Sequence, residues 1–268
     1  MKLAILDSER NVKGQKELPQ QFSEEYRPDL IRRAIMALQS AARQVYGASP
    51  EAGMRYSSRV SKRRRNYRGC YGFGISRVNR KVLSRRGMRM FWVGATTPQT
   101  VGGRRAHPPK SEKILERKIN QKENQKAIRS AMAATISKTL VEQRGHKVPE
   151  KYPFIIDSSV EQLEKTKDIT ATLLTLGFQD ELDRSSVKKV RSGRGKSRGR
   201  KYQRKKGPLV VVSGDCPLLT SAKNIAGVDV VEVKALNAEL LAPGSMPGRI
   251  TLWTEKAIEV LQETKLFM

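Results

Sequence analysis

Two stretches of the chain carry cations at a density suited to binding a polyanion. Between Ala52 and Ser111 there are sixteen Lys or Arg and no Asp or Glu, and thirteen of the sixteen are Arg. Arg presents a planar fork that binds phosphate bidentately and stacks on bases, whereas Lys is a point charge. Residues 188–206 add eleven Lys or Arg, again without a carboxylate. These stretches, the first arm (52–110) and the second arm (188–206), therefore predict contacts with phosphate groups.

Aromatic residues and glycines are interleaved with the cations of the first arm. Six of the chain's fifteen aromatic residues lie there, and such rings stack on unpaired bases, which is typical of RNA recognition. Glycine permits tight turns and close backbone approach. The side chains predicted to contact RNA are Arg55, Arg59, Lys62, Arg63, Arg64, Arg65, Tyr67, Arg68, Tyr71, Arg77, Arg80, Lys81, Arg85, Arg86, Arg89, Trp92, Arg104, Arg105 and His107 in the first arm, and Lys196, Arg198, Arg200, Lys201, Tyr202 and Arg204 in the second.

The arms account for the whole net charge of the 268-residue chain. Together they hold 27 cations, which equals the formal net charge of +27, so the rest of the chain is neutral. Like charges repel and keep such segments out of a packed core unless a polyanion neutralises them. Two alternatives are less favoured. A disordered tail rarely carries so many rings, and neither arm has the amphipathic period of a membrane-surface helix.

The sequence indicates a protein of a reducing compartment. No apolar run approaches the roughly 20 residues that span a bilayer, and Met1–Asp7 is too short for a signal sequence. Cys70 and Cys216 lie far apart in unlike contexts, which argues against a disulfide framework. We expect a cytoplasmic protein without membrane contact.

Outside the arms, short apolar runs alternate with amphipathic segments. Strands are predicted at 3–6, 154–156, 209–212, 228–233 and 250–253, and helices at 29–45, 111–144, 168–176, 217–223, 236–241 and 254–261. Gly47, Gly145 and Gly177 are placed to end helices, 14–28 reads as a polar connection, and the polar run 120–125 marks a break in the second long helix. The alternation predicts an α/β fold, a single domain over 1–268 whose mostly parallel sheet is flanked by helices. Both arms then leave it as loops, and the length of the first implies a function.

Motifs for phosphate or dinucleotide binding are incomplete. Gly195-Lys-Ser197 matches the end of a P-loop, but Val190 stands where that loop needs its first Gly. Gly72-Phe-Gly74 begins a dinucleotide fingerprint, yet Arg77 occupies the third glycine position. Neither predicts a nucleotide cofactor.

Candidates for catalysis or metal binding are equally sparse. His107 and His146 cannot be combined with Cys70 and Cys216 at zinc spacing. We expect His107 to order the backbone or contact RNA, His146 to complement a helix C-terminus and Cys70 to be a structural or incidental thiol. The acidic residues predicted to form an exposed cluster, rather than an acid–base pair, are Asp180, Glu181 and Asp183. We therefore expect no cofactor, no metal site and no small-molecule substrate, and nothing requires an enzyme.

Four stretches of sequence together resemble one family closely. They are Gly103-Arg-Arg-Ala-His-Pro-Pro109, Ala127-Ile-Arg-Ser-Ala-Met-Ala-Ala134, Gly195-Lys-Ser-Arg-Gly-Arg-Lys-Tyr-Gln-Arg204 and Leu241-Ala-Pro-Gly-Ser-Met-Pro-Gly-Arg-Ile-Thr251. They are similar to the large-subunit ribosomal protein L4 family in its archaeal and eukaryotic branch, and more so to the archaeal form. The resemblance covers essentially the whole chain.

The resemblance implies a structural constituent of the large ribosomal subunit, located on the ribosome in the cytoplasm. It implies an α/β body on the solvent side and a long internal loop, here Ala52–Lys110, that penetrates the rRNA and helps to line the polypeptide exit tunnel. Arg198–Tyr202 matches a second RNA-contacting loop. The implied partners are large-subunit rRNA, neighbouring large-subunit ribosomal proteins and the nascent chain near the loop tip.

Two other classes of function are open on the residues alone. A regulator could bind a messenger RNA or DNA through the same arms, although the rest of the chain shows no groove-reading helix. An RNA-modifying enzyme on an α/β fold would need a cofactor fingerprint or a convergent acid–base set, and neither is evident.

The charge pattern yields a test that needs no structure. Replacing Arg63, Arg64 and Arg65 by Gln should weaken RNA binding and flatten its dependence on salt, by about 0.7–0.9 in the log–log slope for each lost phosphate contact. The unfolding temperature should not change, because the first arm contributes little to the core. A large fall in unfolding temperature with an unchanged salt slope would show that these arginines are structural.

Overall fold

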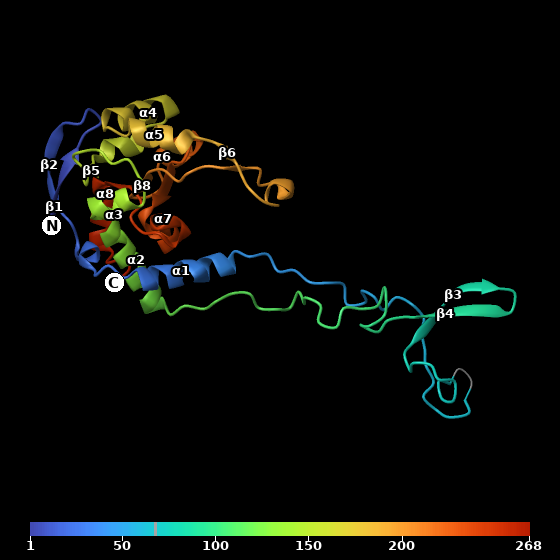
Figure 1. Cartoon of the computed structure of the whole chain (residues 1–268). Coiled ribbons are helices and arrows are strands. Elements are labelled where there is room, and N and C mark those ends of the chain that lie inside the picture. Colours follow the sequence, from blue (N-terminus) through green and yellow to red (C-terminus); the bar gives the residue numbers. More distant parts are fainter. Residues whose placement is uncertain (67–68) are drawn as a thin grey trace. The chain divides into compact units, whose positions relative to one another are not determined.

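The computed structural model describes residues 1–66 and 69–268, and Tyr67 and Arg68, both predicted to contact RNA, lie outside the described residues (Figure 1). The chain divides into two compact units. The body comprises Met1–Ala41 and Arg117–Met268, and the insertion comprises Ala42–Glu116. Within the described ranges, no helix is both long and apolar enough to cross a membrane.

The body is built on one six-stranded sheet of order β2-β1-β5-β10-β8-β9. β1 pairs antiparallel with β2, and the other neighbours are parallel. The strands are β1 (Lys2–Leu6), β2 (Val12–Glu17), β5 (Ile155–Ile156), β8 (Leu209–Val212), β9 (Asp229–Glu232) and β10 (Thr251–Thr254). The predicted α/β fold with a mostly parallel sheet is confirmed.

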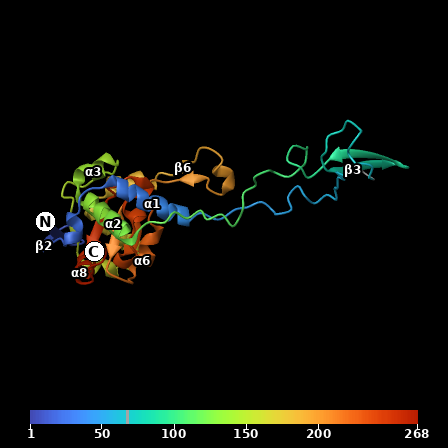
Figure 2. The same cartoon turned by 90° about the horizontal axis from the view of Figure 1, so that it is seen from below.

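Helices cover both faces of this sheet, so its central strands are buried on both sides. Along β8 the side chains alternate, with Leu209 and Val211 in one core and Val210 and Val212 in the other. The first core is closed by α1 (Pro28–Ala41), α2 (Gln121–Ile136), α7 (Ala238–Leu241) and α8 (Glu255–Glu263), and the second by α4 (Thr166–Thr175) and α6 (Leu218–Ser221). α1 and α2 lie side by side (Figure 2). Helices that were not separately predicted include α3 (Lys138–Gln143), α5 (Gln179–Ser186) and the short 3-10 turn Gln20–Ser23.

Several predicted boundaries are wrong, and burial explains them. α1 ends at Ala41 rather than near Gly47, and α2 begins at Gln121 rather than at 111. Residues 41–50 are all exposed, and Ile114 is 83% exposed, so these apolar residues have no core to pack against. The break between α2 and α3 falls at Ser137, not at 120–125.

The polar connection predicted at 14–28 overlaps strand β2, which the sequence pattern does not indicate. β2 is an edge strand whose residues are exposed or half-buried, and it is held by backbone pairing with β1. An edge strand without an apolar face lacks the alternation by which strands are recognised. Gly145 and Gly177, in contrast, adopt the left-handed φ values of +89° and +93° expected of residues that end helices.

The insertion contains a β-hairpin that the sequence analysis did not predict. β3 (Arg80–Arg86) and β4 (Arg89–Gly94) pair antiparallel, with an irregularity between Val82 and Ser84. Gly87 makes the turn with φ of +57°. The buried residues of the insertion's described part are Cys70 and Ala95. Ala95 lies at the hairpin base, where its N–H donates to Asn79, and the Cys70 thiol donates to the carbonyl of Ser61 at 3.4 Å. Cys70 is a free, buried thiol.

The two limbs of the insertion run side by side near its ends. The backbone N–H of Ala48 donates to the carbonyl of Pro109 at 2.9 Å. Gly47 has no room for a side chain, because a Cβ there would stand 2.4 Å from the backbone nitrogen of Ser111. Gly53, with φ of +76°, lies equally close to the backbone of Arg104. Glycine is required here by close backbone approach, not by a helix end.

Thr254 connects the end of β10 to the start of α8, and its hydrogen bonds can be tested by mutation. Its hydroxyl accepts a hydrogen bond from the N–H of Ala257 at the start of α8 and donates to Glu161 at 2.5 Å. Thr254→Ala removes the cap and one partner of a buried carboxylate, so unfolding free energy should fall by about 1–3 kcal/mol. The measurement is urea denaturation.

Thr170→Ala is the matched control, because its hydroxyl bonds only to a carbonyl of its own helix, that of Thr166. It should stay within about 0.5 kcal/mol of the parent. Equal losses for the two variants would mean that the Thr254 contacts add nothing specific.

Candidate nucleic-acid interface

The predicted RNA-binding side chains within the described residues lie at the surface. Tyr71, Arg80 and Lys81 are half-buried and the others are exposed. None of the cations among them forms an ion pair in the part of the chain that the structure describes; the acidic residues of the body pair instead with cations of the body. These predicted contact cations thus carry uncompensated charge, which an external polyanion can neutralise, whereas Lys206 at the end of the second arm pairs with Asp229.

The hairpin brings like charges together across its strands. Arg86 stands directly opposite Arg89, and an isolated bridge pairs Arg59 with Arg80. Like charges directly opposite each other destabilise a strand pair. Phosphates between or beside these guanidinium groups would convert the repulsion into attraction.

One face of the hairpin also offers apolar surface. Val82 pairs with Trp92, and Met90 follows on the same face by the alternation of the strand. These side chains are 42%, 41% and 37% exposed. Exposed apolar and aromatic groups flanked by Arg85 suit contacts with the faces of unpaired bases.

Several rings already carry a cation on one face. The ammonium of Lys81 lies 3.1 Å from the ring centre of Tyr56, and the guanidinium of Arg77 lies 4.4 Å from that of Tyr71. In the second arm, Lys188 stands 3.7 Å over Tyr202. A second cation lies near two of these rings, Arg64 at 5.9 Å from the ring centre of Tyr71 and Lys201 at 5.5 Å from that of Tyr202. Such cation–π contacts order the arms locally.

The second arm is a hairpin that leaves the body between α5 and β8, as Figure 1 shows. β6 (Lys189–Val190) pairs with β7 (Tyr202–Gln203), and a turn of 3-10 helix at Lys196–Arg198 ends at Gly199 with φ of +78°. The N–H of Arg191 donates to the carbonyl of Lys201 at 2.8 Å. This geometry holds the cations of the tip on a short, exposed ribbon.

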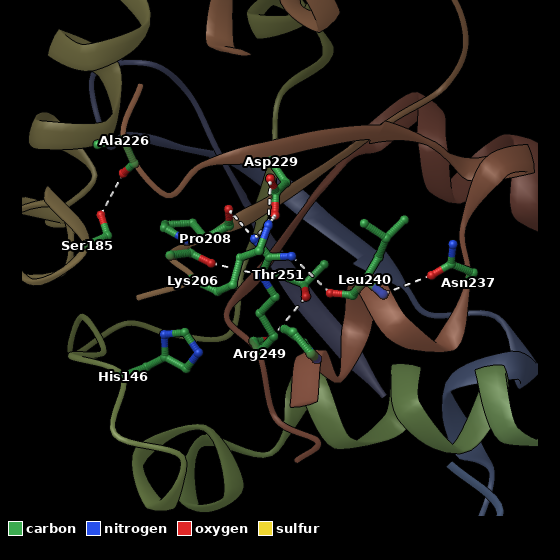
Figure 3. A network of polar contacts seen from close by, with 12 residues as sticks. His146, Ser185, Lys206, Pro208, Ala226, Asp229, Asn237, Leu240, Arg249 and Thr251 are labelled. Carbon is green, nitrogen blue, oxygen red and sulfur yellow. Dashed lines mark hydrogen bonds and ion pairs between the residues drawn. The ribbon is translucent and has the colours of Figure 1, made fainter. Parts of the chain in front are cut away.

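A buried guanidinium holds the root of the second arm (Figure 3). Arg249 is 0% exposed and donates to the carbonyls of Gly207 and Leu240 at 2.8 and 3.0 Å. It also donates to Asp229 at 2.6 Å, and Lys206, the last cation of the arm, reaches the same carboxylate at 2.8 Å. Burial opposes ionisation of Asp229, but the bond from Lys206 and the charge of Arg249 outweigh it and lower the pKa of that carboxyl.

A fully buried carboxylate, Glu181, takes part in a second network at this root. Glu181 is 0% exposed and accepts bonds from Arg184 at 2.7 and 2.5 Å and from the N–H of Lys147 at 3.0 Å. His146 lies 2.7 Å away through Nδ1. Arg184 also donates to the carbonyl of Lys206 at 2.7 Å. Burial works against the charged carboxylate, but these hydrogen bonds lower the pKa of Glu181 to about 2.

Two predictions about this region are wrong. Glu181 does not belong to an exposed acidic cluster, because it is buried and bonded to Arg184 and His146, whereas Asp180 and Asp183 are exposed. His146 does not complement a helix end but is buried beside Glu181, and burial lowers its pKa. These partners are 35 residues apart in sequence, so no local pattern reveals them.

The body carries a basic patch that the sequence analysis missed. Arg32 and Arg33 of α1 line a groove of about 360 Å³ together with Arg117 and Lys118. Arg33 is compensated by Glu123 at 2.9 Å, and the other three have no ion-pair partner within the described ranges. The neutral charge balance outside the arms conceals the patch, although two adjacent arginines on the polar side of a helix are a usable signal.

The carboxyl edge of the sheet, where open α/β folds bind ligands, is closed by internal contacts. Glu161 accepts bonds from both the N–H and the hydroxyl of Ser213, and from Thr254. Asp157 is paired with Lys13 at 2.5 Å. Among the described residues, no group of three or more His, Cys, Asp or Glu could hold a metal ion.

The chain was compared with families of known proteins and with individual relatives. Residues 16–264 match the model of the ribosomal protein L4/L1 family. The chain is 48% identical over 268 residues to the large ribosomal subunit protein uL4 of Nanoarchaeum equitans, with 100% of both chains covered. It is 44% identical to that of Archaeoglobus fulgidus, covering 98% of this chain and 99% of the relative, and 43% identical to that of Methanocaldococcus jannaschii, with the same coverage.

The chain belongs to the ribosomal protein L4/L1 family. Members of the family are structural ribosomal proteins, so this one is not an enzyme. The resemblance inferred from four sequence stretches is confirmed, including its archaeal character.

The structure explains two of those stretches physically. Arg249 in Leu241–Thr251 is the buried clamp described above, and Gly248 before it packs against the backbone of Leu140 with φ of +88°. The stretch Gly103–Pro109 begins with a glycine that has no room for a side chain, because a Cβ on Gly103 would stand 2.0 Å from the carbonyl oxygen of Thr97. Both stretches therefore position the arms of this L4/L1 family member, in addition to any contact with RNA.

The clamp predicts a large cost for a single buried guanidinium. Arg249→Met leaves Asp229 without its buried partner and two carbonyls without donors, so unfolding free energy should fall by about 3–5 kcal/mol. Urea denaturation of the whole chain measures it. Arg32→Met, at an exposed arginine of the same body, should cost no more than about 0.5 kcal/mol. A loss at Arg249 no larger than that at Arg32 would show that the clamp does not hold the root.

Proposed function

We propose that this protein is a structural constituent of the large ribosomal subunit that binds its rRNA through both arms. The observation that carries the proposal is the set of surface cations that have no carboxylate partner within the described residues, in a chain of the ribosomal protein L4/L1 family. Its place is on the ribosome in the cytoplasm, where it meets rRNA and other ribosomal proteins.

Binding of this kind is driven by neutralisation rather than by bond making. Each phosphate held by an Arg or Lys releases condensed counterions, which makes the affinity strongly dependent on salt. The cations fix the position of the RNA backbone, and exposed rings, such as Tyr56 and Tyr202, accept unpaired bases. The bidentate fork of Arg favours it over Lys along the first arm.

In the organisation that we propose, residues 1–268 form one α/β domain with the first arm (52–110) and the second arm (188–206) as its RNA-binding loops. The first arm has 59 residues, so each limb has about 29 and spans at most roughly 95 Å at ~3.3 Å per residue. Even at half that reach, a limb exceeds the ~16–17 Å radius of gyration of a compact unit of about 190 residues. The arm is therefore long enough to carry its middle deep into an RNA mass.

The middle of the first arm is the part that we propose to lie nearest the nascent chain in the exit tunnel. This is the segment Arg68–Arg89. The turn of the hairpin supports the choice, because Met88 is 95% exposed and Gly87 lets the chain reverse in little space. Arginines on the same segment suit a wall made of RNA.

Association with ribosomes tests the function. The tagged protein should co-sediment with large subunits through gradients at high salt, where adventitious binding to nucleic acid is lost. Recovery on messenger RNA or DNA in place of large subunits would support a regulator and overturn the proposal.

Deleting 67–89 tests the placement of the tip. The shortened protein should still enter large subunits, because the remaining cations of both arms are kept. The tunnel constriction should widen in electron microscopy maps, and the response to tunnel-binding inhibitors should change. Assembly with both properties unaltered would show that this segment is not at the tunnel.

A further inference from the structure

A cleft of about 910 Å³ opens between the two limbs of the insertion. Residues 43–46 form one side, and residues 105–115 form the other. Its volume lies at the upper end of the ~300–1,000 Å³ typical of small-ligand sites. The charged and aromatic residues on the lining that matter here are Arg43, Tyr46, Arg105, His107, Lys110 and Lys113.

One end of the cleft is fixed by the contact between the limbs. Just beyond Tyr46, the N–H of Ala48 donates to Pro109, and Gly47 packs against the backbone of Ser111. Pro108 and Pro109 both line the cleft, and the proline ring restricts φ. The wall that carries His107 is therefore stiffer than an ordinary loop.

The charge of the lining is strongly unbalanced. Four cations face one carboxylate, that of Glu112. None of the four forms an ion pair in residues 1–66 and 69–268, nor does Glu112. Tyr46 is 62% exposed, although a tyrosine ring gains by being covered. A concave site with cations and an open ring matches a ligand that is both anionic and aromatic.

We propose that this cleft binds an unpaired nucleotide of the rRNA, with its base stacked on Tyr46 and its flanking phosphates held by Arg43, Arg105 and Lys113. The inference rests on the proposed function and adds a defined site to it. Arg43, Tyr46 and Lys113 lie outside the acid-free run 52–111 and were not among the side chains predicted to contact RNA. They extend the interface toward the ends of the insertion.

The geometry favours an unpaired nucleotide over a duplex. A duplex presents phosphates on a convex surface and hides the faces of its bases, whereas a cleft with a ring inside it needs a base that has left its stack. Glu112 repels phosphate from its own position but accepts a hydrogen bond from a base N–H or a ribose 2′-hydroxyl. The single carboxylate thus orients the nucleotide in an otherwise basic cleft.

Tyrosine variants test the stacking. The full chain is titrated with large-subunit rRNA transcript, and Tyr46→Ala should weaken binding by about 5- to 150-fold, the range for loss of one base–aromatic stack. Tyr46→Phe keeps the ring and should stay within about twofold. Tyr26→Ala removes an exposed ring of the body, 40% exposed, and should have no effect.

Salt dependence separates the ring from the cations. Tyr46→Ala should leave the log–log salt slope unchanged because the ring carries no charge, while Lys113→Gln should reduce it by about 0.7. Unaltered affinity of Tyr46→Ala, or an equal loss for Tyr46→Phe, would overturn the stacking proposal. Absence of binding by the unmodified chain would instead reject the proposed function itself.

Photo-crosslinking and free nucleotides identify the source of the ligand. Ultraviolet irradiation of the complex should attach a nucleotide from a single-stranded position of the transcript to the peptide that holds Tyr46. Adenosine and guanosine monophosphate alone should not saturate the site at micromolar concentration, because they lack the flanking phosphates. Tight binding of either one, or crosslinks confined to paired positions, would refute binding of an unpaired rRNA nucleotide.

Discussion

Transferring a guanidinium group out of water requires an anion to take the place of its hydration, and this requirement divides the arginines of the chain into two kinds. Arg249 is fully buried because Asp229 and three carbonyls surround it. The arginines of the arms have no such partner within the described residues, and they lie at the surface. The architecture follows, since the body can close a core around paired charges while the arms stay outside until an external anion joins them.

The same requirement explains why both buried networks lie at the root of the second arm. A ribbon of like charges tends to pull away from the body that carries it. Arg184 and the side chain of Lys206 connect the Lys206 end of that ribbon to Glu181 and Asp229, whose lowered pKa values keep them ionised at neutral pH. For Glu181 the folded pKa is below the unfolded one, so its contribution to stability is present above about pH 4.5 and is lost as the pH falls toward 2.

The sequence predicts those parts whose cause is local. β8 is predicted with its correct bounds because four apolar residues in a row, three of them β-branched, fit a strand that is buried on both faces. The cap at Thr254 and the exposed cations of the arms follow equally from local chemistry. The burial of Glu181 and Arg249 depends on residues distant in sequence, and the end of α1 at Ala41 depends on where the core stops. The hairpin β3–β4 was missed because its charges mask the alternation of its apolar residues.

Contacts between the two limbs of the insertion lower the entropy cost of ordering it on RNA. Ordering a backbone costs roughly 1–2 kcal/mol per residue, and RNA binding alone would have to offset that cost for a loop without internal structure. Gly47 and Gly53 let the limbs approach to backbone contact, and the hairpin fixes a further part of the insertion before RNA is present. Less of the affinity gained from each phosphate contact is then lost to ordering the chain, as in other preorganised binding surfaces. Glycines at close-approach positions therefore contribute to RNA affinity without touching RNA, and a Cβ at Gly47 would weaken binding by separating the limbs.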